Sequence, residues 1–249
     1  MREEAEENKL QGDVFDATWN RWHTCSLCEQ HYHGVVACAL GWACWKTYVG
    51  RPEEDYARRG AINVLGNFLS TAEHHEDALS VREAELSMRR RLGDSEQNIF
   101  VVQSNLATTY HMLDRPEEAN RMLKDVYSRR LRLYGEEHRS TIVAANNYAS
   151  SLNRLQRHTE AKSVLRKMVP VARRILGEGH RLTLKMRWTY AMTLYQDDGA
   201  TLDDLREAVE TLEFVAPTWK RVFGPSHPET PLVHGALEEA HKALAARAS

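Results

Sequence analysis

The sequence predicts an all-α protein made of stacked helix hairpins, an αα-hairpin solenoid, and three observations support this fold class. Glycine and proline are scarce: 13 Gly and 7 Pro in 249 residues are about 8%, against a usual share nearer 12%. Anchor positions recur at a fixed interval, because Gly93, Gly135 and Gly177 are 42 residues apart. Apolar residues between these anchors follow the spacing of amphipathic helices.

Three markers keep the interval in register. An aromatic residue or Leu precedes each anchor glycine, and Gly224 follows after 47 residues, with the extra residues in a polar stretch at 196–200. Asn-Leu-Ala at 105–107 returns as Asn-Tyr-Ala at 147–149 and as Thr-Tyr-Ala at 189–191. Glu-Ala pairs also recur, beginning at positions 118, 160 and 207. Markers that move together indicate true repeats.

Each repeat is expected to contain two helices. Leu106, Tyr110 and Leu113 lie on one helical stripe, and a second apolar stripe follows after a short break. A lone hairpin would leave an apolar face in water, so the pairs are expected to stack into one extended core. Small residues mark positions where backbones approach closely and a large side chain would overpack the core. These are Gly66, Ala107, Ala149 and Ala191 in the first helix, and Ala78, Ala119, Ala161 and Ala208 in the second.

The connections between repeats resemble those of the tetratricopeptide repeat, in the long form typical of kinesin light chains. They run YGEEHRSTIVAANNYA from Tyr134 to Ala149, LGEGHRLTLKMRWTYA from Leu176 to Ala191, and FGPSHPET from Phe223 to Thr230. The resemblance implies a right-handed superhelix. Glu96 stands where the first connection would carry His, which departs from the pattern. The repeats alone do not imply a kinesin heavy chain as partner.

The remaining segments flank the repeats. We expect an acidic segment and a Cys- and His-rich head over residues 1–33, a capping helix pair over 34–60, four repeats over 61–233, and a C-terminal capping helix over 234–249. The apolar run Gly34 to Trp45 falls short of the ~18 residues that span a bilayer, so it predicts a buried helix and no membrane insertion. Trp42, Trp45 and Tyr48 are expected to supply the apolar bulk of this short Cys/Trp-rich cap.

The resemblance further implies a binding module that holds an extended segment of a protein or peptide partner on a concave surface lined by the first helix of each pair. Asn side chains suit such a ligand, because one amide offers a donor and an acceptor to the peptide backbone. Arg154 would pair with a carboxylate and Trp188 would anchor an apolar group. For any single residue the alternative is a solvated helix face. The predicted peptide-binding residues are Asn63, Asn67, Ser104, Asn105, Thr108, His111, Asn146, Asn147, Ser150, Asn153, Arg154, Trp188, Thr189 and Met192.

All four cysteines, Cys25, Cys28, Cys38 and Cys44, lie within 20 residues, which favours thiols or a metal site over structural disulfides in a reducing compartment. A zinc ion is the one cofactor considered, and its ligands would be Cys25, Cys28, His33 and Cys44, with Cys38 as the alternative fourth ligand. Buried packing thiols and redox chemistry are the alternatives. In a competing hypothesis the Cys- and His-rich head is a ligase-like or regulatory finger and the repeats only select its target. A third hypothesis is a sensor of a small molecule or short peptide.

Charge and motifs argue against other functions. Lys and Arg number 33 against 35 Asp and Glu, a net charge of −2 that lacks the basic excess of a nucleic-acid binder. No nucleotide-binding, hydrolase or zincin motif occurs, so we expect a non-enzymatic protein. The cluster at 74–77, His-His-Glu-Asp, is expected to begin a helix. The first residues are acidic and lack an apolar run, so we expect no secretory signal and a cytoplasmic protein.

Overall fold

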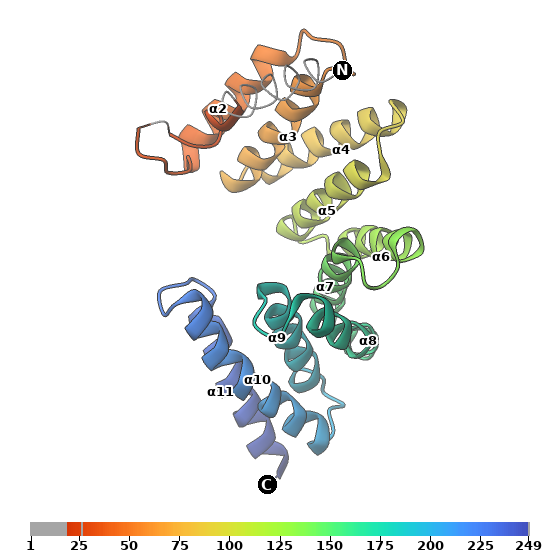
Figure 1. The fold of residues 1–249 in the computed structure, drawn as a ribbon, viewed down its shortest axis with the longest axis vertical. Helices are drawn as coiled ribbons and strands as arrows, with labels where there is room; N and C mark the ends of the chain where they lie inside the picture. The colour runs from red at the N-terminus through yellow and green to blue at the C-terminus, as the bar shows by residue number, and fades with distance from the viewer. Residues whose placement is uncertain (1–18, 26, 249) are drawn as a thin grey trace, which may run out of the picture. The chain divides into compact units, whose positions relative to one another are not determined.

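The computed structural model describes residues 19–25 and 27–248, and in this part of the chain the regular elements are α-helices (Figure 1). One isolated antiparallel bridge joins Thr24 to His31. The acidic segment expected at the start of the chain lies, up to residue 18, outside the described residues. The helices are α2 (Gly34–Tyr48), α3 (Tyr56–Thr71), α4 (His75–Arg91), α5 (Glu96–Met112), α6 (Pro116–Tyr134), α7 (Arg139–Arg154), α8 (His158–Leu176), α9 (Arg181–Tyr195), α10 (Leu202–Phe223) and α11 (Thr230–Ala248).

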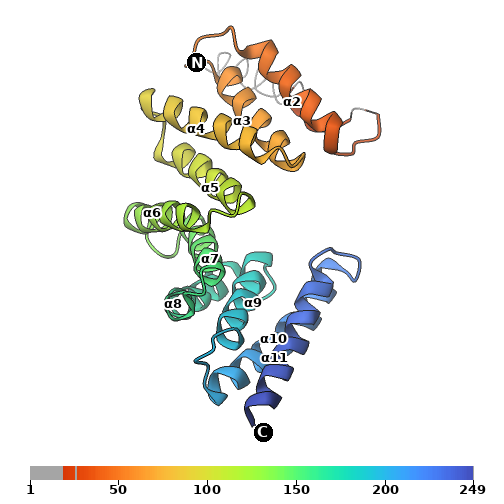
Figure 2. The ribbon, with the colours of Figure 1, turned by 180° about the vertical axis from the view of Figure 1, so that it is seen from behind.

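The chain divides into two compact units, Met1–Arg115 and Pro116–Ser249, called unit 1 and unit 2. In unit 1, α2 packs on α3, α3 on α4 and α4 on α5. In unit 2, each of α6 to α10 packs on the helix that follows it, and α9 also contacts α7 and α11 (Figures 1 and 2). The predicted all-α repeat solenoid is therefore confirmed within each unit.

Helices α3, α5, α7 and α9 are the first helices of the repeats, here called helix A, and α4, α6, α8 and α10 are helix B. The segment 34–60 holds α2 and only the first turn of α3, so the expected helix pair is a single helix. The reason lies at Asp55, whose carboxylate accepts the backbone N–H groups of Ala57 and Arg58 and so starts α3 at Tyr56. At the other end, α11 begins at Thr230, before the expected boundary of 234.

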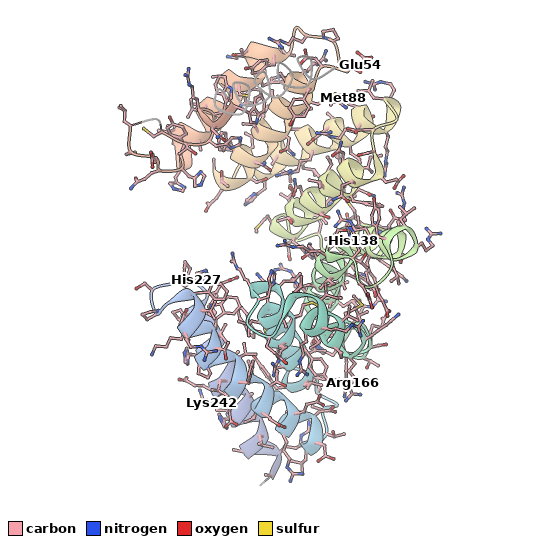
Figure 3. All side chains as sticks on the ribbon, viewed as in Figure 1. Glu54, Met88, His138, Arg166, His227 and Lys242 are labelled. Carbon is pink, nitrogen blue, oxygen red and sulfur yellow. The ribbon has the colours of Figure 1, made fainter. Side chains whose placement is uncertain are left out.

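The Gly, His and Thr pattern of the connections builds the entry into helix A, and two of its histidines, His138 and His227, are labelled in Figure 3. Gly135 has φ +77°, a left-handed conformation that ends the preceding helix B. The ring nitrogen of His138 accepts the N–H of Ser140, which caps α7, and the Thr141 hydroxyl donates to the Arg130 carbonyl. The connection with Gly177, His180 and Thr183 repeats these roles. In the last connection His227 accepts the N–H of Glu229, whereas the Thr230 hydroxyl donates to the carbonyl of Gly224 within the connection. These histidines are structural caps.

The small residues lie where the sequence predicted close approach. The Ala residues at 107, 149 and 191 in helix A, and at 78, 119, 161 and 208 in helix B, are fully buried. At Gly66 an added Cβ would come 3.3 Å from the Cγ of Arg82 on α4. These positions therefore set the distance between neighbouring helices.

The apolar run at 34–45 forms α2, but only one face of this helix is buried. Ala37, Gly41 and Cys44 face α3, whereas Val35 is 85% exposed and Trp42 41% exposed. The expectation that Trp42 packs in the cap is thus wrong, because α3 is the one helix on which α2 packs in the described part of unit 1. Trp45 and Tyr48 do pack there. Among residues 19–25 and 27–248, no helix combines the length and apolar character needed to cross a membrane.

Candidate functional site: the helix-A faces

The candidate site is the polar surface of the A helices, which we call the helix-A face and describe separately for each unit. In a helix, residues three, four and seven apart share one face. In unit 1 this rule places on the face Tyr56, Arg59, Asn63, Asn67 and Ser70 of α3, and Asn98, Val101, Asn105, Thr108 and Met112 of α5. In unit 2 it places there Val143, Asn147, Ser150 and Arg154 of α7, and Lys185, Thr189 and Met192 of α9.

On α3, the two predicted asparagines are bonded to helix B. Asn67 donates to the side-chain oxygen of Asn63 at 3.2 Å and accepts from Arg82 at 2.9 Å. Asn63 donates in turn to Glu85, which lies on α4 with no exposed surface. These amides join α3 to α4, so they are not spare donors and acceptors for a ligand.

The same network continues through charged groups. Glu85 pairs with Arg89 at 2.8 Å, and Asp94 pairs with Arg89 at 2.7 Å and with Arg59 at 3.3 Å. Burial raises the pKa of Glu85, although Arg89 opposes this effect. Burial acts the same way on Asp94, but hydrogen bonds from Asn98, Arg89 and the Ser95 N–H outweigh it and hold the pKa of Asp94 below its ordinary value. Arg59 and Arg89 are thereby fixed in place.

A cavity of about 280 Å³ opens between α3 and α5 beside this network. Asn63 and Arg59 line it from α3, and Asn98 and Val101 line it from α5. Trp19, at the start of the described chain, also lines it, and the Trp19 ring lies 2.5 Å from the position of a Cβ added at Gly60. A larger residue at position 60 would therefore displace this ring.

Asn105 is an uncommitted amide on the helix-A face of unit 1. Its side chain is half-buried, and no hydrogen bond joins its amide to another group among the described residues. Ser104 and Thr108 use their hydroxyls locally, donating to the carbonyls of Phe100 and Ser104. His111 is half-buried in the last turn of α5. Val101 and Met112, 42% and 59% exposed, add apolar surface on the same stripe.

Asn147 holds the equivalent position in unit 2. It is half-buried, as is Ser150 one turn later, and neither side chain has a hydrogen-bond partner in the described part of the chain. Asn153 instead bonds to α9, donating to the Thr193 hydroxyl at 2.8 Å. Arg154 is exposed at the end of α7. Asn147 and Ser150 are therefore the residues of α7 with unused polar groups on this face.

Three predicted residues of unit 2 belong to the core. Asn146 is 4% exposed and Thr189 is 8% exposed, and the Thr189 hydroxyl donates to the Lys185 carbonyl. Trp188 packs edge-on against the buried ring of Trp219, with centroids 6.1 Å apart, so it does not present an apolar anchor. Met192 is half-buried. The available surface of α9 is smaller than the sequence suggested.

Sequence reasoning missed the residues at the N-terminal ends of the same stripes. Tyr56 and Arg59 precede Asn63 by seven and four residues, and Asn98 and Val101 precede Asn105 by the same intervals. Helical spacing alone would have placed them on the helix-A face. Trp19 had no such signal, because it comes from the head.

The four predicted zinc ligands are not brought together. In residues 19–25 and 27–248, no three His, Cys, Asp or Glu side chains cluster so as to hold a metal ion. Cys44 is fully buried between α2 and α3, and this burial raises its pKa to about 12, which disfavours the thiolate that zinc needs. Cys25 lies apart from it, next to Cys28, and N–H groups of Leu27 and Cys28 hold the pKa of Cys25 low. His33 is exposed before α2.

Comparison with known proteins supports the repeat assignment. Residues 101–140 and 141–182 match the family model described as tetratricopeptide repeat. A search of curated protein sequences finds no match. The fold resembles BtubC (BKLC) from P. vanneervenii, with a TM-score of 0.70 and 15% identity over 85% of this chain and 84% of that one.

Two further solved structures share the fold. A Podosopora anserina protein of kinesin-light-chain type with nearly identical TPR-like repeats gives a TM-score of 0.64 and 22% identity, over 78% of this chain and 90% of that one. A Rap protein complexed with competence and sporulation factor gives a TM-score of 0.52 and 15% identity, over 84% of this chain and 58% of that one.

The two matched segments are tetratricopeptide repeats, and αα-hairpins of the same architecture flank them on either side. The connections of the chain carry Gly, His and Thr in the fixed positions described above, and its structural neighbours include repeats of that type. In fold and in the pattern of its connections the chain resembles tetratricopeptide repeat proteins of the kinesin-light-chain type.

Proposed function

We propose that the chain is a protein-interaction module, without catalytic activity of its own, that binds an extended segment of a partner through the helix-A faces. The observation that carries this proposal is the contrast among its asparagines. Asn63, Asn67 and Asn153 are bonded to neighbouring helices, whereas Asn105 and Asn147 are accessible and have no partner in the described chain.

The chemistry of these two positions suits a peptide backbone. They are 42 residues apart and occupy the same place in successive A helices. A side-chain amide donates to a backbone carbonyl and accepts from a backbone N–H, so it can hold an extended chain without recognising its side chains. Unpaired amides in the middle of helices lower helix propensity, and such local conflicts are typical of functional surfaces.

The comparisons support the same class of ligand. The Rap protein, which shares the fold, is complexed with competence and sporulation factor. A preformed surface on rigid helices would lose little entropy when it binds. In unit 1, Val101 and Met112 would add apolar contacts beside Asn105.

The test is to select ligands from a phage-displayed library of random dodecapeptides and to measure their affinity by fluorescence polarisation. Asn105→Ala and Asn147→Ala are each expected to weaken a peptide bound at their own unit by roughly tenfold, because each removes up to two hydrogen bonds worth about 0.5–1.5 kcal/mol each. The matched control is Ser128→Ala with Ser163→Ala, since both serines are exposed on B helices. Unchanged affinity in the double Asn variant would refute the proposal.

A further inference from the structure

Unit 2 carries a second hollow, on the helix-B side of the repeats. It lies between α8 and α10, which both pack on α9, and its volume is about 230 Å³. Leu165 and Val169 of α8 and the ring of Tyr190 on α9 give it an apolar lining. We call it the α8–α10 hollow; Arg166, at its rim, is labelled on α8 in Figure 3.

The preceding repeat shows why the hollow is open. Val169 and Tyr190 stand 42 residues after Tyr127 and Tyr148. There the Tyr127 ring is buried and stacks on Tyr148, with centroids 5.9 Å apart and an interplanar angle of 24°. Val169 is too short to cover Tyr190 in the same way. The exchange of one aromatic ring for an isopropyl group therefore leaves the space.

Three guanidinium groups surround this space. Arg166 and Arg173 come from α8 and Arg187 from α9. In the preceding repeat the positions of Arg173 and Arg187 are held by Leu131 and Ala145, so two of the three cations are particular to this hollow.

The charges around the hollow do not balance. Glu178 pairs with both Arg173 and Arg187, and Glu207 pairs with Arg166 at 3.5 Å. Asp204 lies 3.8 Å from Arg166 and pairs with Lys162. Four cations therefore face three carboxylates. Burial lowers the pKa of Arg187, and the nearby charge of Arg173 acts in the same direction, whereas Glu178 opposes both effects.

We infer that the α8–α10 hollow binds an acidic, extended segment of a partner protein, with one apolar side chain over Val169 and Tyr190 and carboxylates on the rim arginines. Arg166 and Arg173 are seven residues apart, which is about 10.5 Å along a helix, the span of roughly three residues of extended chain. Guanidinium groups suit carboxylates because their paired N–H donors match the two oxygens. This surface is distinct from the helix-A faces, so its test does not depend on the function proposed for them.

The probe is a fluorescein-labelled peptide with Leu-Leu flanked by two Glu on each side, compared with the same peptide carrying Gln in place of Glu. Wild-type protein is expected to bind the Glu peptide at least tenfold more tightly than the Gln peptide, and added salt is expected to narrow this difference. Equal affinity for the two peptides would overturn the inference.

Two variants remove different parts of the site. Arg166→Gln with Arg173→Gln changes side chains that are about half exposed and is expected to weaken binding at least tenfold. Val169→Tyr leaves every charge in place and refills the space as Tyr127 does, and a similar loss is expected. If Val169→Tyr still binds the peptide and has an unchanged thermal midpoint, charge alone attracts the peptide. That result would overturn the inference that the α8–α10 hollow is the binding site.

The matched control is Arg174→Gln with Arg206→Gln, because both arginines are exposed on α8 and α10 and do not line the hollow. Binding within twofold of wild type is expected. A tenfold loss in this control would overturn the inference by assigning binding to the general charge of unit 2. Binding of phosphatidylserine vesicles that is lost in the Arg166/Arg173 variant but kept in Val169→Tyr would also overturn it, in favour of a membrane surface.

Discussion

Replacing Asp94 by Asn is expected to destabilise unit 1 strongly, because this carboxylate joins three helices, α3, α4 and α5. Its side chain is 7% exposed. One oxygen accepts from Arg89 at 2.7 Å and from Arg59 at 3.3 Å. The other oxygen accepts from the Asn98 amide and from the Ser95 N–H, each at 2.7 Å. An amide in this place removes the charge and turns an N–H₂ group toward one of these two sets of donors.

The cost follows from the groups left behind. In the variant Arg89 still pairs with Glu85, but Arg59 loses the one ion pair that it forms among the described residues. The N–H donors that face the new N–H₂ group are left without an acceptor. Buried polar groups left unpaired cost about 1–3 kcal/mol, and breaking a buried ion pair costs about 3–5. Since Arg59 is 25% exposed and water can reach it, we expect a loss of about 2–4 kcal/mol. For a chain of this size that is a fall in thermal midpoint of roughly 5–15 °C.

Thermal unfolding followed by circular dichroism at pH 7 measures this loss, and Glu137→Gln is the control, because Glu137 and its partner Arg174 are both well exposed. The pKa of Asp94 is depressed, so its stabilisation is present above its ordinary value of 3.8 and is lost as the pH falls through the lowered pKa. The gap between wild type and Asp94→Asn should therefore narrow below about pH 4. A midpoint within 2 °C of wild type at pH 7, or a gap that widens in acid, would refute this reasoning.

Other substitutions and chemical probes test separate parts of the structure. Ala149→Leu should cost about 1–3 kcal/mol in urea unfolding, because position 149 is fully buried between helices; no loss would mean that the helices do not meet there. Cys28 should react with iodoacetamide at pH 8 while native Cys44 does not, because Cys28 is exposed and burial raises the pKa of Cys44 to about 12. Mass spectrometry identifies the alkylated residue, and alkylation of Cys44 before Cys28 would contradict this prediction. Asn153→Ala should cost about 1–2 kcal/mol because the hydrogen bonds between Asn153 of α7 and the Thr193 hydroxyl of α9 are lost, and an unchanged urea midpoint would contradict that role.

The repeat architecture could be predicted from the sequence because it depends on local signals that recur. The 42-residue interval predicted the helix pairs, and the small residues at 107 and 149 predicted the helix contacts. The boundary at Tyr56 was missed because it depends on one capping side chain, Asp55, in a segment without a repeat marker.

The site was predicted less well, because periodicity shows which face a residue occupies but not what it touches. Asn63 and Asn105 occupy equivalent positions in helix A of successive repeats. Nevertheless, the Asn63 amide donates to the buried Glu85, while the Asn105 amide has no hydrogen bond among the described residues. Trp188 lies near the predicted face, but its ring turns toward Trp219. The predicted set of zinc ligands was wrong for a related reason. The spacing of the cysteines did not indicate that Cys44 of α2 is fully buried against α3.

The most direct test of the helix-A face is photo-crosslinking with a benzophenone amino acid placed singly at position 105 or 147, and at positions 128 and 163 on helix B for comparison. Each variant is irradiated with the peptide selected from the dodecapeptide library, and adducts are mapped by mass spectrometry. Adducts are expected at position 105 or 147 and none at positions 128 and 163. Adducts confined to the helix-B positions would contradict the assignment of binding to the helix-A face.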